Sequence, residues 1–578
     1  MNRYGLTGLA LCTCLDAIAA DVTVSGRVTF GSVTRLENAD PALLTVINAP
    51  LVGLAGTASG ANADDADLNF KRHDAVSTAV KGLLALHLHD GSTVALVRLK
   101  AWRDIALEHG NRPWGNANNG YVGGMPLGDS GAARLSRFSG VALGDAWVQD
   151  SIDIGSARLL GRIGQQLVPW GGPGSAGSGL EALNARDAPA ARRAGAVAQE
   201  TRVPAPMLFA RLALQPTLAL EGFVGGRFTP AALDMCGTFW AVSDYLANGC
   251  DVVMAGLPAQ DDRTRVRTGA VLRRLPTPAP RGRDIGLALQ WTAMGTDFGV
   301  YQARTTWRSP LPGLRRSSRI GRAIVPGNPD GKNMAFMTEY PERIGLTAAT
   351  FTRRVAGTTT FGELSWRPRT PFMLSPGDVL PPFMNPTVPA LLRAAADVVP
   401  PGGFFHGYDF HPVVQWQLGV QHDGRIGATP VSASAEVVAK HVIGLPDQAL
   451  RRYGRADLFG VGPVFGVCTV TTADAARQCT QNGYVTSNAV SYRLRVEARW
   501  PALAPRTAVV ASAAWVHDVK GWSGDFLINQ GRKSLNLGLR VEYRQRYLLE
   551  LTYLPIWGGA YNPFTDRDTL AYAVGVKF

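Results

Sequence analysis

Strict alternation of apolar and polar residues dominates the C-terminal part of the chain. Every second residue from Leu570 to Phe578 is apolar. The stretches 491–500, 535–543 and 547–553 follow the same rule, with arginines and glutamates on the opposite face. A period of two sustained over this length predicts β-strands with one apolar and one polar face.

The length and ends of these strands favour a membrane barrel over a soluble sandwich. They run about 10 to 14 residues, longer than typical globular strands and sufficient for a tilted membrane crossing. Trp500, Tyr543, Tyr547 and Tyr553 stand near strand ends, where membrane barrels carry aromatic girdles. The terminal Phe578 is similar to the C-terminal signal that bacterial barrel-assembly machinery recognises.

Strand pairs with short connections recur along the whole chain. Long segments, most of about 30 to 45 residues, separate these pairs, far above ordinary loop lengths. Short turns at one end and long loops at the other are typical of outer-membrane barrels. With a first strand over 22–33 and three strands after 534, the count is about 18, with 16 as the alternative. The predicted hairpins cover 76–103, 141–167, 207–228, 285–308, 344–367, 413–442 and 491–518.

The N-terminus predicts export. Arg3 precedes a short apolar stretch from Tyr4 to Leu15, and Ala17-Ile18-Ala19 fits a signal-peptidase site. We expect residues 1–19 to form a signal peptide and residues 20–578 to form a single transmembrane barrel domain. A buried N-terminal helix or strand is the alternative.

Composition narrows the class of protein. Of 578 residues, 46% are hydrophobic and 18% are charged, yet no segment offers the roughly 20 apolar residues of a transmembrane helix. Helical membrane proteins and disordered chains are therefore excluded. The nucleophile-elbow, zinc-protease and phosphate-loop motifs are absent from the sequence, so we expect no enzyme and no cofactor. A serine and a histidine that meet only in space would escape this reasoning.

The cysteines outside the predicted signal peptide form two local pairs, Cys236 with Cys250 and Cys468 with Cys479. Each pair lies in a segment rich in turn-forming residues and falls in a predicted long loop. An exported protein favours disulfides at such places. Zinc binding is the alternative, but neither segment has the spacing or the histidine that it needs.

The charged residues on the predicted strands are expected to line the barrel interior. The chain carries a formal net charge of +13, and an arginine-rich channel would favour anions. An arginine–glutamate ladder that only fills a packed interior is the alternative, and dispersed charges in an exported protein argue against nucleic-acid binding. The residues predicted to line the lumen are Arg98, Lys100, Arg158, Arg162, Arg304, Arg308, Glu363, Arg367, Arg493, Arg495, Glu497, Arg499, Arg540, Glu542 and Glu550.

Two predicted outward loops, 41–54 and 371–405, are unusually apolar. They would plug the barrel mouth, contact lipid and hydrophobic cargo, or pack on one another; the second includes a possible short helix over 390–399. The Gly-rich stretch 171–179 predicts a flexible loop. His87 and His89 share a strand face but have no evident third ligand, so no metal site is expected.

Six phrases resemble the domain of unknown function 1302 family, in order and over nearly the whole mature chain. The resemblance implies an outer-membrane barrel of proteobacteria. Such proteins are often encoded near other envelope proteins and near proteins for the export or catabolism of hydrophobic compounds. The family has no established catalytic or ligand residues. Arg343 and Gly345 stand where many members differ. The phrases are DADLNF (65–70), GRIGQQLVPWG (161–171), YPERIGLTAATF (340–351), FGELSWRPRTP (361–371), HDVKGWS (517–523) and YNPFTDRD (561–568).

Three functions remain open at this stage. The first is an outer-membrane channel or transporter of a Gram-negative bacterium for a hydrophobic or amphipathic, anionic compound, gated by the apolar loops. The second is a general anion-preferring diffusion porin, and the third is a non-conducting structural or assembly barrel. The expected partners are outer-membrane lipid and lipopolysaccharide, the barrel-assembly machinery and an unidentified cargo, with no nucleic acid.

Overall fold

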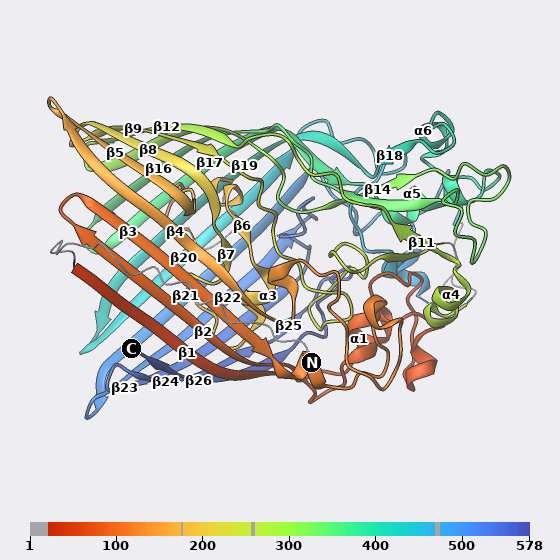
Figure 1. The fold of residues 1–578 in the computed structure, drawn as a ribbon, viewed down its shortest axis with the longest axis horizontal. Coiled ribbons are helices and arrows are strands. Elements are labelled where there is room, and N and C mark those ends of the chain that lie inside the picture. Colours follow the sequence, from red (N-terminus) through yellow and green to blue (C-terminus); the bar gives the residue numbers. More distant parts are fainter. Residues whose placement is uncertain (1–20, 175–176, 178, 256–259, 469–473) are drawn as a thin grey trace, which may run out of the picture.

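The computed structural model describes residues 21–174, 177, 179–255, 260–468 and 474–578. The predicted signal peptide, residues 1–19, lies outside this part of the chain. The described chain forms a closed antiparallel barrel with a large mass of loops at one end (Figure 1). We call this end the loop end and the opposite end, where strands join by tight turns, the turn end.

Eighteen strands close the barrel in the described chain, which confirms the predicted fold class and the higher of the two predicted counts. The first strand pairs with the last, Arg27 opposite Lys577 and Arg35 opposite Thr569, so the sheet has no free edge. The barrel strands are β1 (Asp21–Arg35), β2 (Ala75–Asp90), β3 (Thr93–Asp104), β4 (Ser139–Ile154), β5 (Ala157–Gln166), β8 (Ala205–Gln215), β9 (Leu218–Gly225), β12 (Ile285–Ala293), β13 (Thr296–Thr305), β16 (Ile344–Val355), β17 (Thr358–Met373), β19 (Tyr408–Ile426), β20 (Thr429–Val442), β21 (Asn488–Ala504), β22 (Thr507–Lys520), β23 (Lys533–Tyr543), β24 (Tyr547–Leu554) and β26 (Thr569–Lys577).

The turn end joins the strands more tightly than the sequence predicts in two places. The sequence predicts the turn between β19 and β20 over residues 423–430, but the strands continue to Ile426 and Thr429. The turn between β21 and β22 is likewise shortened, because residues up to Ala504 pair with the next strand. A tight turn joins the predicted strands 535–543 and 547–553, and its residues Arg544 and Gln545 both have the positive φ that a two-residue hairpin turn requires.

The loop end carries most of the short elements, while α3, β6 and β7 lie inside the barrel. Their hydrophobic residues form clusters that pack loop against loop above the barrel, so most of the apolar core lies at this end. The helices are α1 (Asp65–Asn69), α2 (Ile105–His109), α3 (Ala188–Arg192), α4 (Asp262–Thr268), α5 (Pro376–Met384), α6 (Arg393–Asp397) and α7 (Ala475–Gln478), with 3-10 turns at η1 (Pro41–Leu43), η2 (Ala49–Val52), η3 (Ala117–Asn119), η4 (Arg134–Ser136), η5 (Leu180–Leu183) and η6 (Asp457–Phe459). The short strands are β6 (Ala185–Arg186), β7 (Arg202–Val203), β10 (Val252–Met254), β11 (Val271–Arg274), β14 (Leu311–Arg315), β15 (Ala335–Glu339), β18 (Phe404–His406) and β25 (Ile556–Trp557).

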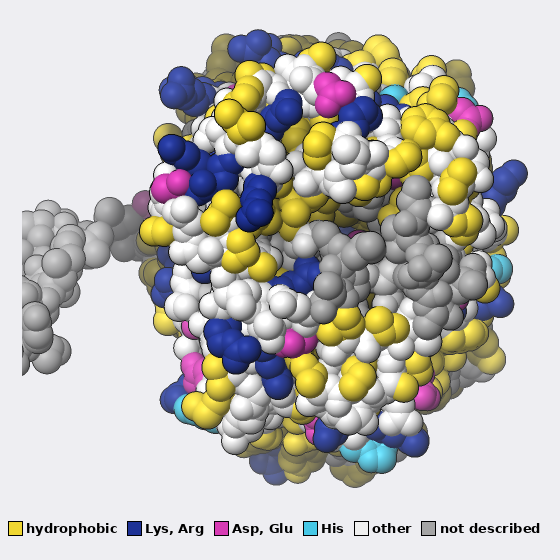
Figure 2. All heavy atoms as spheres, turned by 90° about the vertical axis from the view of Figure 1, so that its right-hand side faces the viewer, with side chains coloured by type: hydrophobic (Ala, Val, Ile, Leu, Met, Phe, Trp, Pro, Cys, Tyr) yellow, Lys and Arg dark blue, Asp and Glu magenta, His cyan; other side chains and the backbone are white. Residues whose placement is uncertain are grey.

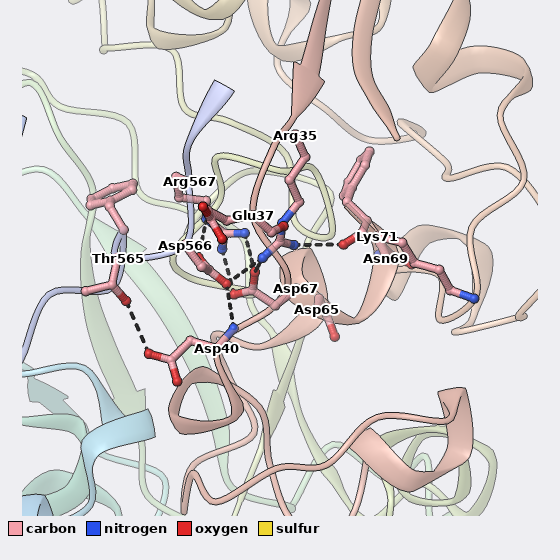
Figure 3. A network of polar contacts seen from close by, with 12 residues as sticks. Arg35, Glu37, Asp40, Asp65, Asp67, Asn69, Lys71, Thr565, Asp566 and Arg567 are labelled. Carbon is pink, nitrogen blue, oxygen red and sulfur yellow. Dashed lines mark hydrogen bonds and ion pairs between the residues drawn. The ribbon is translucent and has the colours of Figure 1, made fainter. Parts of the chain in front are cut away.

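A buried ion-pair network fastens the loops to the seam between β1 and β26 (Figure 3). Arg35, at the end of β1, bonds Asp566 at 2.5 Å and lies 3.1 Å from Asp67 of α1. Arg567, just before β26, holds the two carboxylate oxygens of Asp67. Two arginines thus compensate two aspartates, all four almost completely buried.

Candidate permeation pathway

The outer face of the barrel is apolar. Exposed side chains on this face include Val24, Leu86, Ile163, Leu287 and Leu551, each alternating with a side chain that points inward. The tyrosines Tyr543, Tyr547 and Tyr553 are also exposed, near strand ends. An apolar band with aromatic side chains at its edges is the surface of a barrel embedded in a membrane. None of the helices in the described part of the chain has the length and apolar character to span a membrane.

Most of the predicted lumen residues lie on the inner face of their strands. Arg540 bonds Glu550 at 3.0 Å across β23 and β24, and Arg27 bonds the same carboxylate at 3.1 Å. The inner-face residues also include Arg98, which pairs with Asp145, and Arg162, which bonds the amide oxygen of Gln149. The others on this face are Lys100, Arg158, Glu363, Arg367, Arg493, Arg495, Glu497, Arg499 and Glu542.

Two predicted lumen residues lie elsewhere. Arg304 pairs in register with Ile285 and shares the outer face of β13 with Val300. Apolar and polar residues do not alternate strictly along this strand. The sequence therefore did not reveal that Arg304 lies on the outer face. Arg308 lies beyond the end of β13, where it bonds Asp284 at 2.6 Å and the carbonyl of Leu183 at 3.1 Å.

A connection between β5 and β8 folds into the barrel and crosses its interior. We call residues 179–203 the inward segment; it holds α3, β6 and β7 (Figure 1). On one wall, Leu180 donates its N–H to Glu363 at 3.1 Å, and Arg367 donates to the carbonyl of Gly179.

On the opposite wall, lysines of the barrel anchor the same segment. Lys100 bonds Asp187 at 2.5 Å and Lys81 bonds Glu200 at 3.0 Å. The backbone of β1 approaches closely as well: a Cβ at Gly31 would lie 2.8 Å from the Cβ of Ala194. The segment is therefore held on both sides and narrows the lumen.

Three cavities lie in a row from the loop end into the barrel. The outer pocket, about 380 Å³, lies beneath α5 and is mostly apolar. The middle cavity, about 490 Å³, shares Asn62 and Asp457 with it. The inner cavity, about 400 Å³, lies against the strands β21 to β26 and shares Arg192 and Trp240 with the middle cavity. These two side chains therefore mark the boundary between loops and lumen.

The boundary is built from α3 and a neighbouring loop. The guanidinium of Arg192 lies 4.5 Å from the ring centre of Trp240, a cation–π contact, and its Nε lies 3.6 Å from Asp234. Arg192 and Trp240 were missed by the sequence reasoning, because neither stands on an alternating strand. The lysines Lys81 and Lys100 face inward and find their acidic partners, Glu200 and Asp187, in the inward segment; inward-facing lysines were the available signal for an acidic segment inside the barrel.

The lining charges are mainly positive in both deeper cavities. The middle cavity is lined by Arg192, Arg455, Arg493 and Arg532 against one acidic residue, Asp457. The inner cavity is lined by four arginines and two glutamates: Arg192, Arg193, Arg495, Arg540, Glu497 and Glu550. Viewed from the loop end, hydrophobic and basic side chains are mixed and acidic ones are sparse (Figure 2).

The two apolar loops pack mainly on other loops. Leu43 and Leu44 are buried among residues of distant loops. In the second loop, Val379 of α5 and Leu392, just before α6, join a cluster with Phe372 and Leu314. The predicted helix over 390–399 is present as the shorter α6. Residues 175, 176 and 178 of the predicted Gly-rich loop lie outside the described residues.

Both predicted disulfides are present: Cys236 is bonded to Cys250, and Cys468 to Cys479. Each closes a loop at the loop end. His87 and His89 lie on the inner face of β2 near the turn end. Among the described residues, neither belongs to a group of side chains that could hold a metal ion.

A family model, "Protein of unknown function (DUF1302)", matches residues 5–578. The chain belongs to this family. None of the curated proteins matches this DUF1302 chain.

Alignments with solved structures cover almost the whole length of this chain. OccAB1 of Acinetobacter baumannii is 8% identical, with 97% of this chain and 96% of that chain covered and a TM-score of 0.40. OccD3 (OpdP) of Pseudomonas aeruginosa is 9% identical, with 96% and 90% covered and a TM-score of 0.39. A BenF-like porin of Pseudomonas fluorescens Pf-5 is 9% identical, with 97% and 98% covered and a TM-score of 0.40. At these scores the likeness carries no inference about function.

Proposed function

We propose that this protein is a channel in the outer membrane of a Gram-negative bacterium and that it passes an amphipathic anion. The observation that carries the proposal is the row of cavities, which runs from an apolar outer pocket to an inner cavity with surplus arginines. An amphipathic anion fits this order, because its apolar part is held outside while its charge is attracted inward. The terminal strand, ending at Phe578, is the element we expect the barrel-assembly machinery to bind.

The apolar helices α5 and α6, which cover the outer pocket, are the proposed gate. Leu380 and Met384 of α5 line the outer pocket, and α6 packs against α5. Deleting residues 382–399 should therefore raise the open-channel conductance. An unchanged conductance would remove these helices from the gating role and leave the inward segment as the constriction.

Single-channel conductance in a planar bilayer, with a salt gradient to read ion preference, tests the proposal. We expect small anion-selective currents. The variant Arg192→Gln should lower the anion preference, because it removes a positive charge from the boundary between the two deeper cavities. Arg304→Gln is the matched control, since Arg304 lies on the outer face and should leave selectivity unchanged.

The other functions predict different currents. A large, steady conductance with little dependence on Arg192 would favour a general diffusion porin. Complete silence, both in the intact protein and after deletion of residues 382–399, would contradict a channel and favour a structural barrel, whose interior the inward segment merely fills.

A further inference from the structure

Four aspartates from two separate loops converge at the loop end. Asp64 and Asp65 lie at the start of α1 in the loop 36–74; Asp244 and Asp262 belong to the loop 226–284, with Asp262 at the start of α4. None is more than 3% exposed. Carboxylate oxygens of Asp64, Asp65 and Asp244 all lie within 4.8 Å of one another.

Three oxygens of this cluster have no hydrogen-bond partner among the described residues: Asp65 Oδ2, Asp244 Oδ1 and Asp262 Oδ1. All three atoms are buried. Leaving a charged, buried carboxylate oxygen without a donor is strongly unfavourable unless a cation or a proton neutralises it. The aspartate cluster therefore lacks compensating positive charge.

Neighbouring side chains do not supply that charge. Arg265 is the cation that lies close enough to favour the charged form of Asp262, while Asp261 and Asp457 add further negative charge to the surroundings. Burial, and then the nearby carboxylates, raise the pKa of Asp65 well above its ordinary value, and burial and Asp64 do the same for the pKa of Asp244. The guanidinium of Arg265 thus favours the charged form of one of the four carboxylates, Asp262.

Polar neighbours hold the carboxylates in place. Trp114 donates its indole N–H to Asp65 Oδ1 at 2.8 Å. The amide of Asn48 bridges the two loops, donating to Asp262 Oδ2 at 2.9 Å and to Asp64 Oδ2 at 3.2 Å. Orientation of ligand carboxylates by donors behind them is a regular feature of metal sites.

We propose that Asp64, Asp65 and Asp244, with Asp262 beside them, bind one divalent cation that clamps the loop 36–74 to the loop 226–284. An all-oxygen donor set supplied by two loops suits a hard cation with flexible geometry, and Ca²⁺ fits it best. The site adjoins the row of cavities, because Asn62 lines the outer and middle cavities and its carbonyl accepts from the backbone N–H of Asp244 at 2.8 Å. The clamp does not depend on whether the barrel conducts.

Terbium(III) luminescence tests the site, since this ion replaces Ca²⁺ and is excited through a nearby tryptophan. In the full barrel, purified in detergent and freed of metal, we expect terbium luminescence that saturates at one ion per chain and that Ca²⁺ displaces. Trp114→Phe should remove most of the signal while calorimetry still detects Ca²⁺ binding, because the indole is 2.8 Å from Asp65 Oδ1.

Substitutions that keep shape but remove charge sharpen the test. Asp65→Asn and Asp244→Asn should each weaken terbium binding by about tenfold or more. Asp251→Asn is the matched control, since Asp251 lies in the same loop as Asp244 and pairs with Arg274 outside the cluster. The heat-dependent gel migration of each variant confirms that the barrel is folded.

The proposal is overturned if the folded wild-type barrel binds neither terbium nor Ca²⁺, or if Asp65→Asn and Asp244→Asn bind as tightly as the wild type. The first result would mean that the cluster is kept neutral by protons, and the second that the ion binds at another site.

Discussion

Helix α1 buries an aspartate on each of two faces, and the two carboxylates have different electrostatic partners. Asp67 is buried between Arg35 and Arg567, which compensate its charge together with that of Asp566. Asp65, two residues earlier and equally buried, points away from this network and faces other aspartates (Figure 3). The helix and the burial are the same, and only the partners differ.

The difference separates structural from binding carboxylates. The charge of a buried carboxylate with guanidinium partners is compensated, and removing that carboxylate breaks the ion-pair network. A buried carboxylate with unsatisfied oxygens needs a cation from solution, or a proton, to neutralise it. Burial alone therefore does not indicate a binding site, whereas burial without compensation does.

The largest effect is expected on the compensated face. Arg567→Met leaves Asp67 and Asp566 with Arg35 as their cation, and loss of one partner from a buried ion pair costs about 3–5 kcal/mol. The free energy of unfolding in detergent, from denaturant titration, measures this. Arg567→Met combined with Asp67→Leu should recover most of the loss, because no unpaired charge remains. A single variant as stable as the wild type would contradict the assigned pairing.

Removing the proposed cation from the aspartate cluster beside Asp65 should have the next largest effect on the stability of the barrel. At a Ca²⁺ concentration one hundred times the dissociation constant, binding adds about 2.7 kcal/mol to stability. A chelator should therefore lower the unfolding temperature of the wild type and lower that of Asp244→Asn by a clearly smaller amount, because the variant binds more weakly. An equal response in both proteins would show that the chelator acts elsewhere.

The smallest effect compares the two faces directly, in metal-free protein. Asp65→Asn removes one of several like charges and should leave stability unchanged or raise it by about 1 kcal/mol. Asp67→Asn leaves two arginines under-compensated and should destabilise the barrel by about 1–3 kcal/mol. Thermal unfolding of the two variants side by side measures the contrast. Equal losses would mean that the two faces do not differ.

The sequence predicted the barrel well because alternation is a local property. The faces of the strands over 491–500, 535–543, 547–553 and 570–578 follow from every second residue, and the strand count follows from the turns. Arg304 was assigned to the wrong face because its strand mixes Gln302 with apolar residues on the outside. The ion partners of Asp67 were out of reach, since Arg567 is 500 positions away in the sequence.

The candidate sites were harder to predict than the fold. Their residues sit in long loops, where no periodicity links position to direction. The inward segment, the Arg192–Trp240 boundary and the aspartate cluster all depend on contacts between loops that are remote in sequence. Asp65 lies in a phrase typical of the family, DADLNF, but that phrase alone does not distinguish a compensated aspartate from an uncompensated one.

The inward segment also bears on how the barrel closes. Ala194 lies against Gly31 of β1, and a Cβ on Gly195 would lie 3.0 Å from Ala573 of β26, so the segment touches both strands of the seam from inside. The final strand pair therefore forms against a third surface as well as against its own partner. Residues 194–195 therefore add an inner contact to the strand pair β1–β26, which joins the beginning of the barrel to its end.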